Sequence, residues 1–125
     1  MSESVDLAEM IEYCMGLPEV EEVTPFGPDA LVYKVAGKMF AVTDPGRHPV
    51  SMNLKCDPDW ALELRDAHDA VEPGWHMNKR HWNTVVLDGS LEVALLQRMI
   101  EHSYELVVQG LKKADRERVL AKWRK

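Results

Sequence analysis

The stretch that decides the fold is LVYKVAGKMFAVT, residues 31–43. Residues 31–35 and 38–43 are both rich in the β-branched and aromatic side chains that favour strands. Ala36 and Gly37 separate the two runs, and glycine accepts the positive φ angle that a two-residue hairpin turn requires. The stretch therefore predicts two antiparallel strands joined by a tight turn.

Further strands follow on both sides of a predicted helix. Residues 44–47, with the sequence DPGR, break the second strand, and residues 50–55 alternate well enough to form a third. Residues 71–75 predict a short strand that is broken by Pro73 and Gly74, and residues 82–87 predict a clearer one. We therefore expect an antiparallel sheet of about five strands.

Helical spacing of apolar residues marks four other segments. One runs from Ser4 to Gly16, and another begins at Asp57 and Pro58 and ends near residue 68. A long helix is expected from Ser90, as its N-cap, to Gly110, and residues 115–125 have helical spacing as well. This order predicts an α+β fold with helices mainly on one face of the sheet.

Length and composition indicate a single domain that covers residues 1–125. The 46% hydrophobic content is enough for one buried core. No apolar run is long enough to cross a membrane, and the acidic N-terminus is unlike a signal peptide, so we expect a cytoplasmic protein. Cys14 and Cys56 lack CxxC spacing and are expected to be reduced and packed.

The distribution of charge is more informative than the net charge of -6. Residues 1–30 contain eight acids and no Lys or Arg, whereas residues 111–125 carry a net charge of +5. An acidic protein is a poor generic binder of phosphate backbones. The basic tail from Lys112 to Lys125 is either a second phosphate-contacting element or a helix that packs, on the acidic first helix of the same chain or in a dimer. We favour packing, because its apolar residues need a surface to cover.

The densest cluster of polar functional groups is WHMNKRHWNT, residues 75–84. It combines cations, amides and aromatic rings, which contact phosphates, base edges and exposed bases. The alternative is structural: Met77 and Trp82 pack inward, Asn78 and Asn83 shape a turn by bonding to backbone, and the two cations, Lys79 and Arg80, are solvated.

No motif indicates catalysis, a metal or a cofactor. The sequence contains no GxSxG, P-loop or GxGxxG pattern, and His76 and His81 do not match a zinc-ligand spacing. His102 lies on the apolar stripe of the long helix, where a core histidine that hydrogen-bonds through one ring nitrogen is expected. We therefore expect a non-enzymatic protein with no cofactor.

Four stretches together resemble the MmcQ/YjbR family: PFGPDALVYKVAGKMFAV (25–42), NLKCDPDWALELR (53–65), PGWHMNKRHWNTVVLDG (73–89) and HSYELVVQGL (102–111). The resemblance implies a two-layer fold of order α-β(3)-α-β(2)-α, similar to the secretion-chaperone-like architecture. It also implies DNA binding through a double-wing motif. The matching positions for DNA contacts are Lys55, Asn78, Lys79, Arg80, His81 and Asn83.

Two other hypotheses remain open beside DNA binding. The chaperone-like fold suggests a protein-interaction module that uses a sheet edge or an apolar groove. The third hypothesis is a small-molecule binder, in which Trp75, Trp82 and His81 line a pocket for a planar drug.

Overall fold

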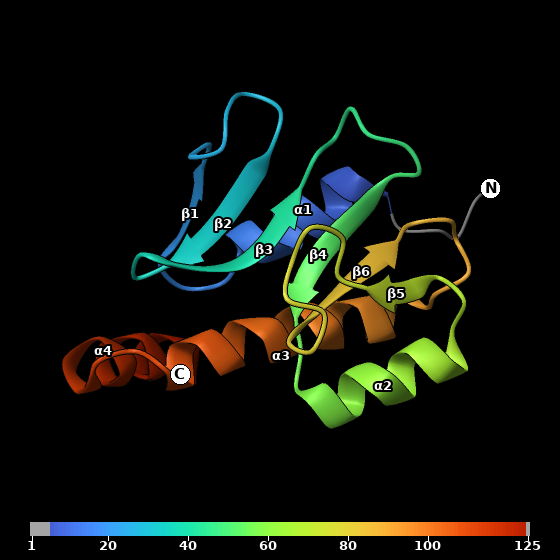
Figure 1. Ribbon diagram of the computed structural model, residues 1–125. Helices are drawn as coiled ribbons and strands as arrows, with labels where there is room; N and C mark the ends of the chain where they lie inside the picture. Colours follow the sequence, from blue (N-terminus) through green and yellow to red (C-terminus); the bar gives the residue numbers. More distant parts are fainter. Residues whose placement is uncertain (1–5, 125) are drawn as a thin grey trace.

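The computed structural model describes residues 6–124, which form four helices and a six-stranded sheet (Figure 1). The helices are α1 (Leu7–Met15), α2 (Pro58–Ala67), α3 (Val93–Gln109) and α4 (Lys113–Trp123). The strands are β1 (Val20–Val23), β2 (Leu31–Val35), β3 (Lys38–Thr43), β4 (Ser51–Lys55), β5 (Val71–Pro73) and β6 (Trp82–Val86).

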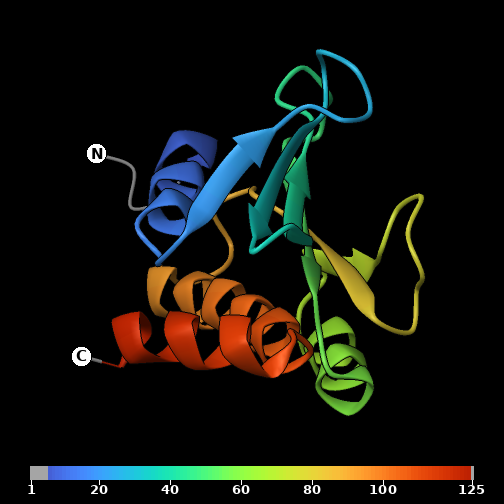
Figure 2. The same ribbon diagram turned by 90° about the vertical axis from the view of Figure 1, so that its left-hand side faces the viewer.

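All strand pairs are antiparallel, and the strand order is β1-β2-β3-β4-β6-β5. Figure 2 shows α1, α3 and α4 on one side of the sheet, and the loop of residues 74–81 on the other. We call the helix-covered side the closed face and the opposite side the open face. The predicted α+β class is confirmed, and α1, α3 and α4 lie together on one face as expected.

The predicted hairpin is present, but the sheet has one strand more than expected. Ala36 and Gly37 have φ angles of 48° and 82°, as a hairpin turn of this kind requires. The additional strand is β1, which pairs with β2 at an edge of the sheet. Its sequence, VEEV, has two exposed acids at its centre and no strong strand signal, so pairing with β2 determines its conformation.

Two helix starts differ from the sequence prediction. Helix α1 begins at Leu7, where Asp6 and Glu9 form a capping box; Ser4 lies outside the described residues. Helix α3 begins at Val93 rather than after Ser90, because the Ser90 backbone N–H and hydroxyl both donate to the Asp88 carboxylate. Ser90 therefore belongs to the turn before the helix and does not cap it.

The core lies between the closed face and α3. Phe40 of β3 is fully buried, and its ring meets the edge of Tyr104 at a centroid distance of 5.3 Å. The buried Ser103 hydroxyl donates to the Phe40 carbonyl and accepts a 2.9 Å hydrogen bond from the Lys55 backbone N–H. These bonds join β3 and β4 to the middle of α3.

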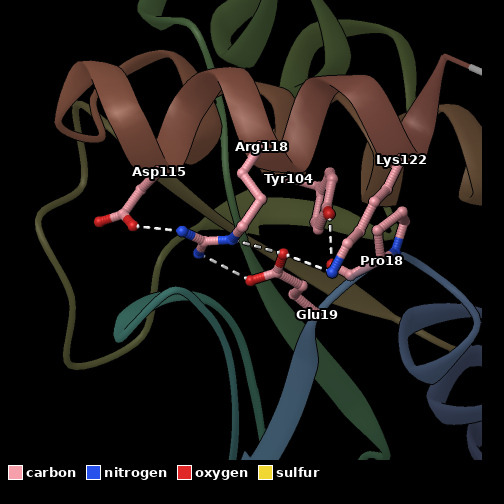
Figure 3. Close-up of polar contacts among 6 residues, drawn as sticks. All are labelled: Pro18, Glu19, Tyr104, Asp115, Arg118 and Lys122. Carbon is pink, nitrogen blue, oxygen red and sulfur yellow. Dashed lines mark hydrogen bonds and ion pairs between the residues drawn. The ribbon is translucent and has the colours of Figure 1, made fainter.

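Helix α4, the basic tail, packs within the same chain as predicted, but mainly on α3 and on Glu19 instead of on α1. The rings of Trp123 and Tyr104 meet edge to face, with a centroid distance of 4.9 Å. Glu19, which follows α1, accepts hydrogen bonds from Arg118 (2.8 and 2.9 Å) and Lys122 (2.9 Å; Figure 3). These bonds, with Arg118 contributing most, lower the pKa of Glu19 to about 2.

Candidate functional site

A groove on the open face is the main candidate site. Three loops, residues 24–30, 44–50 and 74–81, border it at the ends of the strands, and β3 and β4 supply its floor. In Figure 2 the loop of residues 74–81 stands away from the sheet, on the side opposite α1, α3 and α4. The groove therefore lies where no helix covers the sheet.

The groove has a volume of about 370 Å³ and a mainly apolar lining. Its lining residues are Phe26, Ala30, Met39, Val42, Thr43, Asp44, Arg47, Ser51, Asn53, Trp75, His76 and Met77. Phe26 is 69% exposed, so its ring is accessible at the edge of the groove.

Strand register explains which side chains reach the open face. Asn53 of β4 lies directly opposite Thr84 of β6, and the neighbouring pair, Leu54 and Asn83, points to the closed face. The Thr84 hydroxyl donates to Asn53 Oδ1 at 2.6 Å. The open face thus carries a polar pair beside the apolar floor.

This polar pair fixes one wall of the groove. The Trp75 backbone N–H donates to Thr84 Oγ1 at 2.8 Å, and its carbonyl accepts from Asn53 Nδ2 at 3.2 Å. The Trp75 indole N–H donates to Glu72 at 2.8 Å. Both the backbone and the ring of Trp75 are therefore held before any ligand arrives, which reduces the entropy cost of binding.

The other end of the same loop is held by α2 and by the loop itself. Arg65 donates to Asn83 Oδ1 (2.7 Å) and to the carbonyl of Lys79. The Lys79 ammonium donates to the Gly74 carbonyl at 2.8 Å, and so joins the two ends of the loop. A Cβ on Gly74 would lie 2.8 Å from the Trp82 Cβ, so the approach of the loop to β6 requires glycine here.

The six residues that the resemblance matched to DNA contacts differ in exposure and in hydrogen bonding. Arg80 is exposed, and Lys55 and His81 are half-buried. The backbone of His81 is held next to the end of β4, because its carbonyl accepts the Cys56 backbone N–H. Asn78 is exposed, but its Oδ1 accepts from the backbone N–H groups of Arg80 and His81 and shapes a turn.

Asn83 and Lys79 are placed differently from the sequence expectation. Asn83 is only 2% exposed and lies on the closed face, with its Oδ1 bonded to Arg65 and its Nδ2 without a partner within residues 6–124. Through Arg65, Asn83 is linked to the loop of residues 74–81, and its amide is not exposed to solvent. The Lys79 ammonium is bonded to Gly74, although its side chain lies at the surface.

The expected pocket of Trp75, Trp82 and His81 is only partly formed. Trp75 lines the groove, whereas Trp82 is buried and His81 is not among the lining residues. Phe26, Met39 and Arg47 were missed, since they come from three separate segments. An aromatic residue inside the turn-rich stretch PFGPD, residues 25–29, was the available signal, because turns rarely bury such a ring.

Other chemically active groups are already bonded or buried. His102 is half-buried and not part of the core, but its Nε2 accepts the Asp57 backbone N–H at 3.0 Å as expected, and partial burial lowers its pKa. Cys14 and Cys56 are free and buried, and burial raises the pKa of each thiol to about 12. Across residues 6–124, no group of three or more potential metal ligands is clustered, and no helix is long and apolar enough to cross a membrane.

Comparison with known proteins agrees with the motif resemblance. The YjbR family model matches residues 15–106. The uncharacterized protein YbdF of Escherichia coli O157:H7 is 42% identical over 82% of this chain and 84% of its own length. The uncharacterized protein YjbR of Escherichia coli K12 is 34% identical over 88% of this chain and 93% of its own length.

Solved structures share the same architecture. The Deinococcus radiodurans protein DR2400, with a DUF419 domain, superposes with a TM-score of 0.84 and 37% identity, over 94% of this chain and 88% of its own. A Pseudomonas syringae protein superposes with a TM-score of 0.70 and 25% identity, over 82% of this chain and 98% of its own. The extent of the sequence matches shows that the chain belongs to the YjbR family.

Proposed function

We propose that this protein is a non-enzymatic binding protein that holds a flat, largely apolar small molecule in the open-face groove. The observation that carries the proposal is the groove itself, with the exposed Phe26 on one loop and the fixed Trp75 on another. Its volume of about 370 Å³ lies within the range of about 300 to 1,000 Å³ typical of small-molecule pockets.

The chemistry of the lining favours a planar ligand. Aromatic rings stack well on other flat rings, and Phe26 and Trp75 both line the groove. Met39 and Met77 add flexible, polarisable side chains that adapt to ligand shape. The hydroxyl of Thr84 and the amide of Asn53 are already bonded to each other and to Trp75, so these two polar groups contribute little to ligand recognition.

Tryptophan fluorescence during titration with a panel of planar aromatic compounds tests this proposal. We expect saturable quenching or enhancement, and an affinity about fivefold to tenfold lower for Phe26→Ala. The matched control is Leu62→Ala, because Leu62 is 62% exposed but lies on α2, away from the groove. A flat response across the panel, or equal losses in both variants, would contradict the proposal.

DNA binding is the second candidate, and the positions of Lys55, Arg80 and His81 favour it. Lys55 ends β4, and Arg80 and His81 directly precede β6, the strand that pairs with β4; none of the three lines the groove. Single-stranded DNA would suit this arrangement, since its phosphates contact cations while its bases stack on aromatic side chains. The net charge of -6 weighs against strong duplex binding.

The DNA test compares Arg80→Ala with Lys79→Ala in titrations of single- and double-stranded DNA at about 50 and 200 mM salt. We expect salt-sensitive binding that Arg80→Ala weakens. Lys79→Ala also removes the hydrogen bond to the Gly74 carbonyl and can therefore disturb the loop. Its effect on DNA affinity is compared with its effect on the affinity for aromatic ligands, which reports any disturbance of the groove. No binding at the lower salt would exclude this candidate, and salt-resistant binding of a protein partner would favour the protein-interaction hypothesis instead.

A further inference from the structure

We propose that the ligand of the open-face groove is an aromatic acid, whose anionic group pairs with Arg47. This inference rests on the proposed small-molecule function and specifies the chemistry of the ligand. Arg47 lies on the β3–β4 loop and is the only Lys or Arg among the groove-lining residues.

A local turn fixes the backbone of Arg47 at the rim of the groove, where Arg47 also borders a neighbouring hollow lined by Asp29 and Asp44. The Asp44 carbonyl accepts the Arg47 backbone N–H at 3.0 Å, and the Asp44 carboxylate accepts the Gly46 backbone N–H at 3.1 Å. The Arg47 side chain is exposed, and within residues 6–124 its guanidinium forms no hydrogen bond or ion pair. Asp44 thus builds the turn, and the guanidinium stays available.

A ligand that covers Arg47 removes water from its guanidinium. If the ligand is wholly apolar, the five N–H donors of Arg lose their solvent partners and gain none, which opposes binding. A carboxylate or sulfonate replaces that water with short, charge-assisted hydrogen bonds that fit the planar fork of Arg. An aromatic acid satisfies both parts of the groove: the rings meet Phe26 and Trp75, and the anion meets Arg47.

Acidic residues near the groove allow a variant that should strengthen anion binding, as well as one that should weaken it. Asp44 also lines the groove, so its carboxylate repels an anion bound at Arg47. Glu72 lies behind Trp75, where it accepts the indole N–H. Asp44→Asn keeps an acceptor for the Gly46 N–H but removes the charge, and we expect it to strengthen the binding of an anionic ligand.

The experiment uses two fluorescent probes with the same ring system. Anilinonaphthalene sulfonate carries an anionic group, whereas N-phenylnaphthylamine lacks it. We expect Arg47→Gln to weaken the sulfonate probe roughly tenfold, and Asp44→Asn to strengthen it by about twofold to threefold. Binding of the neutral probe should change by less than about twofold in both variants, while Phe26→Ala should weaken both probes. Near-ultraviolet circular dichroism checks that each variant is folded.

The outcomes separate the two proposals. If Phe26→Ala weakens both probes but Arg47→Gln changes neither, the groove binds aromatic molecules and the acid specificity is overturned. If Phe26→Ala and Leu62→Ala have equal effects on both probes, the groove is not the site and both proposals fail. Loss of the sulfonate probe alone in Arg47→Gln, with tighter binding in Asp44→Asn, supports the aromatic acid.

Discussion

On strand β3, Met39 and Phe40 are neighbours in sequence but lie on opposite faces of the sheet. Phe40 is fully buried against Tyr104 on the closed face, whereas Met39 is half-buried in the groove of the open face. The closed face is held by apolar burial, and the open face by a few side-chain hydrogen bonds and three loops. Most of the folding stability therefore resides on the first face, while the second is available for recognition.

The sharpest test of this comparison truncates the two neighbours. We expect Phe40→Ala to lower the free energy of unfolding by about 3 to 5 kcal/mol, because it leaves a cavity against Tyr104. Met39→Ala should cost about 1 kcal/mol or less, since its side chain is already partly solvated. Urea denaturation measures both values. Similar losses in the two variants would show that the open face is also part of the stabilising core.

A smaller effect is expected from Thr84→Val, which tests how the open face is ordered. The change keeps the side-chain volume but removes the hydroxyl, so the Trp75 backbone N–H and Asn53 Oδ1 each lose a partner. We expect a loss of about 1 to 3 kcal/mol and a weaker near-ultraviolet tryptophan signal.

The control for this prediction is Thr24→Val, because Thr24 is exposed and does not line the groove. Its effect should be within about 0.5 kcal/mol. If Thr84→Val retains full stability and full affinity for aromatic ligands, then the Thr84 hydroxyl is not what positions Trp75.

The smallest effect is expected where α4 meets the body of the protein. The ionised form of Glu19 is favoured in the folded state, so its contribution is present above pH 4.5 and is lost as pH falls toward about 2. Because these ion pairs are partly exposed, we expect Glu19→Gln to cost about 1 kcal/mol or less at neutral pH, and less at high salt.

Urea midpoints of Glu19→Gln and the wild type, measured between pH 3 and pH 7, should converge as the pH falls below about 4.5. Glu12→Gln serves as the control, since Glu12 is exposed and forms no ion pair within residues 6–124. A difference that stays constant across this pH range would show that the Glu19 variant acts by some route other than charge.

Local signals were sufficient for most of the fold. The hairpin at Ala36 and Gly37, the start of α2 at Asp57 and Pro58, and the end of α3 at Gly110 all depend on turn and cap residues that act over a few positions. Strand β1 was missed for the opposite reason, because its conformation depends on pairing with β2 and not on its own composition.

The site was harder to predict because sequence proximity did not coincide with spatial proximity. The segment of residues 75–84 looked like one surface, but the alternation of β6 sends Asn83 to the closed face and Thr84 to the open face. Conversely, Phe26, Arg47 and Trp75 are separated by more than 20 residues each and meet only in the folded sheet. The periodicity of a single sequence does not indicate which distant residues come together in the fold.

The two edges of the sheet affect how this protein behaves in a crowded cell. At one edge, β1 exposes Glu21 and Glu22; at the other, β5 is three residues long and ends at Pro73, which has no N–H to offer. Charged, short and proline-terminated edges all resist the addition of a foreign strand. The open sheet can thus keep one face uncovered without serving as a template for amyloid-like growth.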